Sequence, residues 1–306
     1  MPAGSAFVIR FSDGLGNQLF QYAFARMHAH QSSLPLLYDL SWYTGAVGQS
    51  RQDRPFLLPE YHIVARECDA REYARLSPTP RMLSGRLKAL RRLQDWCLGR
   101  RTFYESGTSV LESATSYYPE WMQTGSPGFA SGFFASHHYP DAIRPLLLEE
   151  FQMKQPMSRE ELEITQQVRN EESVCVCFRR GDFAKLPELG IMEEGYYERA
   201  FALIKARVRN PKFYVFSDEP DLAYAALSKL GVEHVEWPNA PRTAPETLRL
   251  MQKCKHFILA NSTYGWWAAW LGQTEQTVVV RPSIWFVGLN KPYAHLFPTR
   301  WLAADL

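Results

Sequence analysis

Short polar stretches follow apolar, β-favouring segments in the second half of the chain, where parallel strands present side chains to ligands. Residues 173–178 run into Arg179-Arg180-Gly181-Asp182, and a forked guanidinium suits a phosphate or a carboxylate. A structural ion pair between an arginine and an aspartate is the alternative. We expect one arginine to serve that structural role and the other to remain for a ligand.

Acidic residues follow the segment 212–217, namely Asp218 and Glu219. Their carboxylates could accept hydrogen bonds from ribose hydroxyls or from the N–H edge of guanine. They could also cap the helix that is expected to begin near Pro220, and the two roles are compatible. These acids therefore suit the nucleoside part of a ligand.

A third polar stretch, Asn261-Ser262-Thr263, follows residues 256–260 and opens a helical pattern. Hydroxyls and free N–H groups at a helix N-terminus favour phosphate. A plain N-cap would use the same residue types, so this stretch alone does not establish a ligand site.

The N-terminal stretch has a similar design. Residues 6–11 lead into the loop DGLGNQ (residues 13–18), and a helical pattern follows directly. Together, these loops offer cations and N–H donors to one anion and acids to a nucleoside, which predicts a bound nucleoside diphosphate. The sequence contains no Asp-x-Asp pair to clamp Mn²⁺ or Mg²⁺. We therefore expect no metal and no cofactor, with arginines stabilising the leaving diphosphate.

The second half alternates strands and helices at the spacing of a parallel, doubly wound sheet. A linker is predicted in residues 151–162, where Ser158 and Glu161 have the spacing of a capping box. We therefore expect two α/β domains, residues 1–155 and 156–306. Strands are expected at 6–11, 34–40, 173–178, 212–217, 234–238, 256–260 and 276–282, and helices at 194–208 and 262–272.

The composition is that of a globular protein with a small net charge and therefore a weak electrostatic field. The formal net charge is +2 and the pI is near 8.2, which disfavours generic nucleic-acid binding. The sequence has no signal-peptide pattern and no apolar run of about 18 residues, so we expect a cytoplasmic protein. Residues 83–101 form a basic amphipathic pattern, which is either a solvated surface helix or a peripheral contact for anionic lipid or a lipid-linked acceptor.

Five cysteines, an odd number without framework spacing, indicate reduced thiols. Cys175 and Cys177 would share one face of a strand, and Cys254 with His256 could complete a set of four zinc ligands. Structural zinc sites usually separate paired cysteines by about two to four residues, so buried thiols are favoured over zinc.

These motifs resemble those of glycosyltransferase family 11, the α-1,2-fucosyltransferases. GLGNQLFQYAFA is similar to the N-terminal signature of the family, and CFRRGDF to its H-x-R-R-G-D-[YF] motif. FYVFSDE is similar to F-S-D-D, and LMQKCKHFILANSTYGWWAAWL to the C-terminal block C-K-H…A-N-S-[ST]-x-x-W-W. The resemblance extends from residue 7 to about residue 302. It implies a GT-B-like fold of two Rossmann-like domains facing across a cleft, and GDP-fucose as a donor used with inversion and without metal.

Site residues are implied position by position. Arg179 would neutralise charge on the leaving β-phosphate, while Arg180 and Asp182 would hold the loop and the cleft. The remaining implied residues are Gly16 and Asn17 for the diphosphate or the acceptor, Asp218, Glu219 and Glu246 for guanosine, and Asn261, Ser262 and Thr263 for the phosphate.

Three positions depart from the family pattern. Cys177 replaces the His of the motif, which removes a nucleotide contact and leaves the donor open. Asp13 replaces a frequent Gly, and Glu219 replaces the second Asp of F-S-D-D. The candidate bases toward the acceptor hydroxyl are Asp13 and Glu188, although Asp13 could cap the first helix and Glu188 could be a solvent-exposed loop acid.

Other functions stay open. Gly14-x-Gly16 after a strand, with Asp39 ending the next, fits a nicotinamide oxidoreductase, but Leu19 occupies the third glycine position. A non-catalytic binder of sugar nucleotides or glycans is another class, and GDP-colitose is an alternative donor. The acceptor implied by the resemblance is a galactose-terminated oligosaccharide or a lipid-linked glycan, as in O-antigen synthesis, modified at O2.

Overall fold

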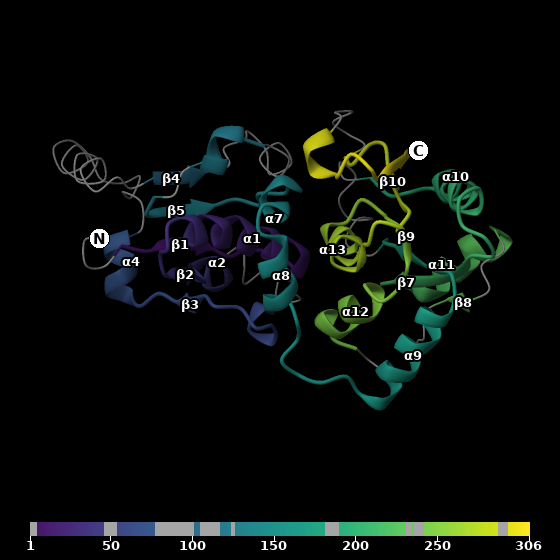
Figure 1. Ribbon diagram of the computed structural model, residues 1–306, viewed down its shortest axis with the longest axis horizontal. Helices are drawn as coiled ribbons and strands as arrows, with labels where there is room; N and C mark the ends of the chain where they lie inside the picture. The colour runs from purple at the N-terminus through teal and green to yellow at the C-terminus, as the bar shows by residue number, and fades with distance from the viewer. Residues whose placement is uncertain are drawn as a thin grey trace. The chain divides into compact units, whose positions relative to one another are not determined.

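Two compact units make up the chain, Met1–Gln152 and Met153–Leu306. The computed structural model describes residues 5–45, 54–76, 101–104, 117–123, 126–180, 190–230, 234–235, 242–286 and 293–306 (Figure 1). The break between the units comes after Gln152, whereas the sequence prediction placed it after residue 155.

The first unit is built on a parallel sheet with the strand order β3-β2-β1-β5-β4. The central strand, β1, is covered on both faces of the sheet, because Phe7, Val8 and Ile9 have no exposed surface. The strands are β1 (Phe7–Arg10), β2 (Leu36–Asp39), β3 (Arg66–Glu67), β4 (Arg101–Tyr104) and β5 (Gly128–Ser131). The helices are α1 (Leu15–Gln31), α2 (Ser41–Thr44), η1 (Leu58–Glu60), α4 (Ala70–Leu76), η2 (Pro119–Gln123), α7 (His138–Asp141) and α8 (Arg144–Glu150).

Helix α1 is buried on most of its surface and is fixed to α8 by a polar cluster. The Tyr22 hydroxyl donates to Glu150 Oε2 at 2.5 Å, and Arg26 Nε donates to Glu150 Oε1 at 2.9 Å. The Val64 N–H donates to the same Tyr22 hydroxyl at 3.1 Å. These contacts hold the helix that follows β1 and therefore fix the loop between them.

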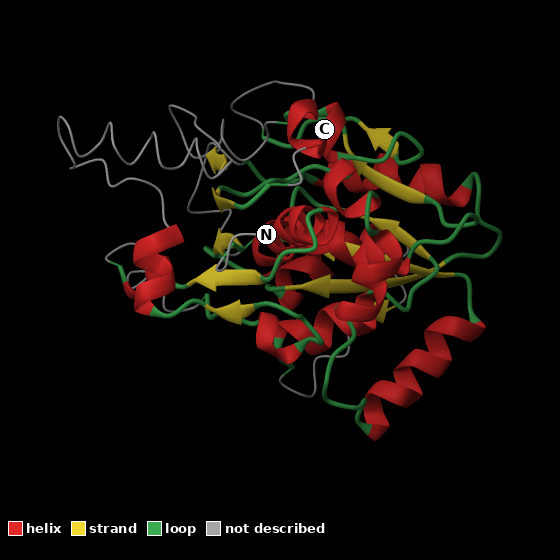
Figure 2. Cartoon of the chain, turned by 60° about the vertical axis from the view of Figure 1, so that its left-hand side comes forward, coloured by secondary structure: helices red, strands yellow, loops and turns green. Residues whose placement is uncertain are grey.

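The second unit is a doubly wound sheet with the strand order β11-β10-β9-β6-β7-β8, and every described pair is parallel. Helices flank the strands, as Figure 2 shows in red and yellow. The strands are β6 (Ser173–Phe178), β7 (Lys212–Ser217), β8 (His234–Val235), β9 (His256–Ile258), β10 (Val279–Pro282) and β11 (Leu302–Ala304). The helices are α9 (Arg159–Asn170), α10 (Glu194–Lys205), α11 (Pro220–Leu227), η4 (Ser228–Leu230), α12 (Ala244–Met251), α13 (Thr263–Gly272) and η6 (Ala294–Leu296).

The order in which strands are added to the sheet reverses between β6 and β9, although the two strands are parallel. The chain runs from β6 outward to β7 and β8, then returns to β9 on the other side of β6 and continues to β10 and β11. Loops that follow neighbouring strands on the two sides of such a switch point leave in opposite directions and open a crevice at the carboxyl ends of the strands. Arg179 follows β6, and Asn261 lies just beyond β9, so both belong to this edge.

The predicted fold class is confirmed, and several predicted elements match. The structure has strands at 173–178 and 212–217 as expected, whereas β3, β4, β5 and β11 were not predicted. Arg101 begins strand β4 and so does not end the helix predicted over 83–101; residues 83–100 lie outside the described part of the chain. Within the described residues, no helix has the length and apolar character needed to cross a membrane.

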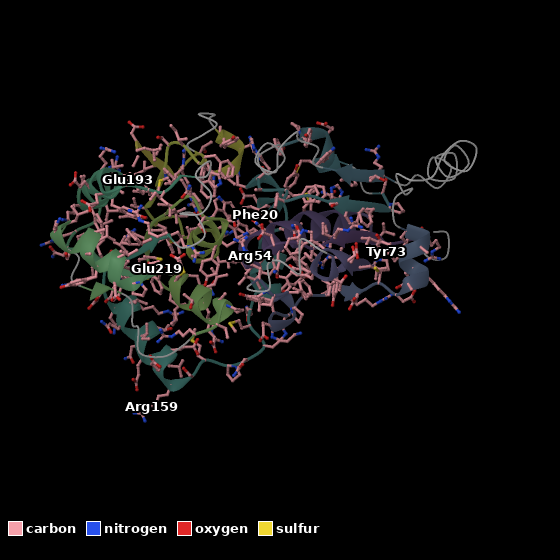
Figure 3. All side chains as sticks on the ribbon, turned by 180° about the vertical axis from the view of Figure 1, so that it is seen from behind. Phe20, Arg54, Tyr73, Arg159, Glu193 and Glu219 are labelled. Atoms are coloured by element: carbon pink, nitrogen blue, oxygen red, sulfur yellow. The ribbon has the colours of Figure 1, made fainter. Side chains whose placement is uncertain are left out.

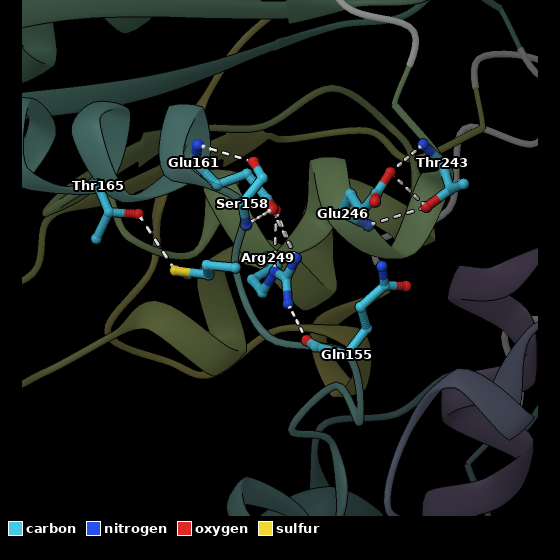
Figure 4. Close-up of polar contacts among 8 residues, drawn as sticks. Gln155, Ser158, Glu161, Thr165, Thr243, Glu246 and Arg249 are labelled. Carbon is cyan, nitrogen blue, oxygen red and sulfur yellow. Dashed lines mark hydrogen bonds and ion pairs between the residues drawn. The ribbon is translucent and has the colours of Figure 1, made fainter.

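A buried ion pair fixes the start of the second unit (Figure 4). Arg249 of α12 places Nη2 2.6 Å from Glu161 Oε1, and its Nη1 donates to the Gln155 carbonyl at 2.6 Å. Glu161 also closes the predicted capping box, because its carboxylate accepts the Ser158 N–H at 2.8 Å. One arginine therefore joins α9, α12 and the segment that precedes α9.

We expect Arg249→Met to lower the free energy of unfolding by about 3–5 kcal/mol, because Glu161 would stay buried without its partner. Urea unfolding followed by tryptophan fluorescence measures this. Arg159→Met is the matched control, since Arg159 is an exposed arginine at the start of α9 whose Nε lies 3.0 Å from Glu163 Oε1 across one helical turn. A shift within about 0.5 kcal/mol is expected for that control.

The same pair gives the stability a defined pH dependence. Burial raises the pKa of the Glu161 carboxyl. Hydrogen bonds from Ser158 and Arg249, together with the charge of Arg249, lower this pKa by more than burial raises it, so the net shift is downward. Its contribution is complete above the ordinary pKa of a glutamate and is lost as the pH falls through the lowered value. An acid limb of stability that is unchanged in Arg249→Met would contradict this assignment.

Candidate functional site

The end of strand β6 is held by an acid from the end of β7. Phe178 and Ser217 are opposite each other in the parallel ladder, so Arg179 and Asp218 emerge side by side. Asp218 Oδ1 accepts the Arg180 N–H at 3.1 Å, and Asp218 Oδ2 lies 3.5 Å from Arg179 Nε. The expected arginine–aspartate pair therefore exists, and Asp218 supplies its acid.

Arg179 keeps hydrogen-bonding capacity in this arrangement. Its side chain is 29% exposed, and among the described residues its ion-pair partner is Asp218. The Arg179 Nε atom is buried and forms no hydrogen bond within that part of the chain. The guanidinium is therefore oriented by a carboxylate without being saturated by it.

Arg180 turns back onto the unit instead. Its Cζ lies 4.9 Å from the centroid of the Phe178 ring, and that ring stacks on Tyr197 at 5.4 Å. The Tyr197 hydroxyl donates to the Cys177 carbonyl at 3.0 Å. These contacts agree with a role for Arg180 in holding the loop.

Asn261 joins three connections at the same edge of the sheet. Its side chain is buried, and Nδ2 donates to the carbonyls of Gly190 at 3.0 Å and Trp285 at 3.1 Å. Gly190 precedes α10 and Trp285 follows β10. The amide of Asn261 therefore has a structural role, which does not test the predicted phosphate contact.

The start of α13 lies at the same edge of the sheet, just beyond β9. Ser262 occupies the N-cap position but makes no capping hydrogen bond, and only 6% of its surface is exposed. Thr263 is the first residue of this ten-residue helix. The positive end of the helix dipole therefore lies at this edge without a capping hydrogen bond from the Ser262 side chain, as expected for an anion site.

Two predicted guanosine contacts differ in their surroundings. Glu246 closes a capping box at the start of α12, where its Oε2 accepts the Thr243 N–H at 2.8 Å (Figure 4). Glu219 is exposed at the start of α11 and makes no side-chain cap there (Figure 3). Glu246 thus has a local structural function, and its proposed contact with guanosine stays a prediction.

Asp13 adopts an unusual backbone conformation at the end of β1. Its φ is 64°, in the left-handed region that favours glycine, which explains why glycine would suit this position. The Asp13 carboxylate pairs with Arg54 and accepts the Gly14 N–H at 3.0 Å. The alternative that Asp13 is the N-cap residue of α1 is not what the structure has, because Gly14 occupies that position.

The rest of this loop is held by backbone contacts. The Asp13 carbonyl accepts Gln18 Nε2 at 2.8 Å and the Tyr43 hydroxyl at 2.9 Å. Gly16 is buried, and the Asn17 N–H donates to the Gly14 carbonyl at 3.0 Å. Arg54 and Tyr43 were not predicted, since neither lies in a recognisable motif; Figure 3 labels Arg54.

Asp182 and Glu188 lie outside the described residues, so their predicted roles stay predictions.

Cys177 is packed beneath the first turn of α13. A Cβ atom placed on Gly265 would lie 2.8 Å from Cys177 Sγ, and Cys177 itself is buried. The missing side chain at Gly265 therefore lets α13 approach β6 two residues before Arg179. This contact limits the size of residue 177, a feature that the motif alone does not reveal.

The zinc alternative finds no support in the described part of the chain, where no group of histidine, cysteine and acidic residues could hold a metal. His256 is engaged elsewhere, since Nε2 lies 3.3 Å from Glu172 Oε2 and Nδ1 accepts the Val278 N–H at 3.0 Å. Burial raises the pKa of the Cys175 thiol well above its ordinary value, with Cys177 and Cys254 adding to this effect. Cys175 is therefore a buried neutral thiol, and Cys177 and Cys254 are buried beside it.

We expect Cys177→His to destabilise the protein by about 1–3 kcal/mol, because Gly265 leaves no room for an imidazole. Thermal unfolding measures this, with Cys68→His at a partly exposed cysteine of the first unit as the control. Gly265→Ala should also destabilise, and less so when combined with Cys177→Ala. Wild-type stability in Cys177→His would show that the contact does not limit residue 177.

Comparison with known proteins gives two relatives that match along nearly their whole length. The chain is 28% identical over 301 residues to the O-antigen biosynthesis glycosyltransferase WbnK of Escherichia coli, covering 92% of this chain and 95% of that protein. It is 26% identical over 314 residues to an alpha-1,2-colitosyltransferase of Escherichia coli, covering 98% and 99%. The galactoside 2-alpha-L-fucosyltransferase Sec1 of Mus musculus is 26% identical over 194 residues, 58% of this chain and 51% of that protein.

Among solved structures, a mutant of Arabidopsis thaliana FUT1 in complex with GDP has a similar fold. The TM-score is 0.50 at 12% identity, and the match covers 92% of this chain and 71% of that one. This similarity concerns the fold alone, which is GT-B with two parallel-sheet α/β units.

The model of the family described as "Glycosyl transferase family 11" matches residues 112–287, more than half of the chain. This match leaves the oxidoreductase interpretation without support. It confirms the resemblance of the motifs, and the chain belongs to glycosyltransferase family 11.

Proposed function

We propose that this glycosyltransferase transfers L-fucose from GDP-β-L-fucose to O2 of a terminal galactoside, with inversion at the anomeric carbon and without a metal ion. The observation that carries the proposal is the arrangement at the end of β6. There, Asp218 orients an unsaturated Arg179, and the first turn of α13, whose N-cap residue Ser262 makes no side-chain capping hydrogen bond, packs on residue 177. A guanidinium and helix N–H groups together suit a diphosphate leaving group.

The chemistry asked of these residues is modest. The O2 hydroxyl of the acceptor attacks the anomeric carbon from the face opposite GDP, while the bond from that carbon to the β-phosphate oxygen breaks. Negative charge grows on the departing phosphate, and the hydroxyl proton passes to a base or to water. Arg179 and the first turn of α13 would stabilise this charge more in the transition state than in the bound donor.

Donor and acceptor are supported by the names of the relatives. The mouse relative is a galactoside 2-alpha-L-fucosyltransferase, which favours fucose and galactose. The relative that matches 98% of this chain is an alpha-1,2-colitosyltransferase, which makes GDP-colitose the second candidate donor. The name of the O-antigen enzyme favours a glycan precursor of an O-antigen as the acceptor.

The test is donor-dependent GDP release, measured with GDP-fucose and with GDP-colitose. Each reaction is run with and without a β-galactoside such as lactose, and each is repeated in EDTA. Acceptor-dependent release from GDP-fucose that survives EDTA would support the proposal, whereas release only from GDP-colitose would reassign the donor. Loss of activity in EDTA, restored by Mn²⁺ or Mg²⁺, would overturn the metal-free mechanism.

We expect Arg179→Ala to lower kcat by about 10²–10³-fold without unfolding the protein, because one charged donor to the leaving phosphate is lost. Arg159→Ala is the control, since it removes an arginine that is exposed at the start of α9. Near-normal turnover in a folded Arg179→Ala variant would rule out the assigned role.

Asp13→Asn separates a positioning role from a base role. We expect kcat to stay within about tenfold of the wild type, since a general base would contribute about 10²–10⁴-fold. The physical reason is that the Asp13 carboxylate is already engaged by Arg54 and the Gly14 N–H. Asparagine also tolerates the left-handed backbone. Disappearance of the acidic limb of the pH–rate profile in this variant would instead identify Asp13 as the base.

A further inference from the structure

Arg281, on strand β10, is a partly buried arginine whose partners do not include a carboxylate in the described part of the chain. Its Nη1 donates to the Pro282 carbonyl at 3.1 Å, and its Cζ lies 4.4 Å from the centroid of the Phe297 ring. The Nε atom is buried and forms no hydrogen bond with a described residue. The Nε atom of Arg179 is likewise buried without a hydrogen bond, but Arg179 has the Asp218 carboxylate as an ion-pair partner and Arg281 has no such partner among the described residues.

The position of Arg281 places it at the edge of the sheet already described. Strand β10 is the parallel neighbour of β9, with Val280 opposite Ile258, so both strands end at the same edge. The bond from Arg281 to the carbonyl of the next residue directs the guanidinium toward the carboxyl end of the strand. The Phe297 ring beneath it is 5.3 Å from the Trp285 ring. The carbonyl of Trp285 accepts from Asn261, the residue before the N-cap of α13.

A desolvated cation without a counterion is unfavourable for folding. Burial lowers the pKa of the Arg281 guanidinium, an effect that the nearby Tyr196 phenol partly offsets. The Phe297 ring gives some compensation through a cation–π contact, but this contact does not satisfy the buried Nε–H donor. A methionine of similar length could fill this space without that penalty, so stability alone does not account for an arginine here.

We propose that Arg281 is a second cationic contact for the anionic diphosphate of the sugar-nucleotide donor, in addition to Arg179. The proposal rests on the proposed function, because the donor named there supplies the anion. The guanidinium lies over the Phe297 ring, with Cζ 4.4 Å from its centroid, and its N–H groups other than the one bonded to the Pro282 carbonyl would contact phosphate oxygens, which lysine could not do from the same position. Arg281 would hold the diphosphate from β10, on the opposite side of β9 from Arg179.

The experiment compares Arg281→Met with the wild type by calorimetric titration of GDP, inorganic pyrophosphate and guanosine, together with thermal unfolding. We expect the dissociation constants of GDP and pyrophosphate to rise at least about tenfold, as for loss of a charged hydrogen bond. Guanosine affinity should be unchanged, and the melting temperature unchanged or raised. Arg300→Met is the matched control, because Arg300 is an exposed arginine of the same unit that donates to the Thr274 carbonyl.

The outcomes separate the two proposals. Arg281→Met that binds GDP within twofold of the wild type and has a lowered melting temperature would make Arg281 structural and overturn this inference alone. An equal loss in Arg300→Met would assign the effect to net charge and also overturn it. Wild-type protein that binds pyrophosphate through Arg281 but not GDP would overturn the proposed donor and leave the anion contact standing. Binding of neither ligand would overturn both.

Discussion

Parallel pairing of β6 with β9 is the constraint on which the rest of the second unit depends. All six residues of β6 are buried, and the remaining strands lie on both of its sides, β7 and β8 on one and β9, β10 and β11 on the other. Because every neighbour is parallel, the carboxyl ends of β6, β7, β9 and β10 meet at one edge. Residues that are more than a hundred positions apart, such as Arg179 and Arg281, therefore come to the same side of the sheet without any direct contact being required between them.

The pairing also explains how polar side chains are divided between structure and chemistry. Asp218 and Asn261 form hydrogen bonds with the backbone of neighbouring loops. Arg249 forms one with the backbone of the segment before α9. Arg179 and Arg281 retain unsatisfied nitrogen atoms at the same edge. A site for an anion is formed when a scaffold of satisfied polar groups holds a few unsatisfied cations in place. The unsatisfied nitrogen atoms of Arg179 and Arg281 lower the stability of the unligated protein, which is expected of a binding site.

Much of this arrangement could be predicted, because strand pattern and motif order are local properties. The strands that contain Cys177 and Phe216 and the capping box at Ser158 follow from residue type and spacing. The strands of the first unit beyond β2 could not be predicted, since β3 has two exposed residues and β4 lies in an irregular pattern. Arg54, Gly265 and Arg281 could not be predicted either. Their significance comes from contacts with Asp13, Cys177 and Phe297 that are distant in sequence.

One buried amide, that of Asn261, restrains the connections after β6, β9 and β10 together. An insertion or deletion in one of these connections must keep its carbonyl within reach of the same Nδ2, or the other two lose their common anchor. Variation in length at this edge is therefore expected to occur as coordinated change in several loops, not in one at a time. If a longer connection after β10 were taken from a homologue and grafted alone into this chain, it would disturb the loop that contains Gly190. The two segments are far apart in sequence, but both are bonded to Asn261.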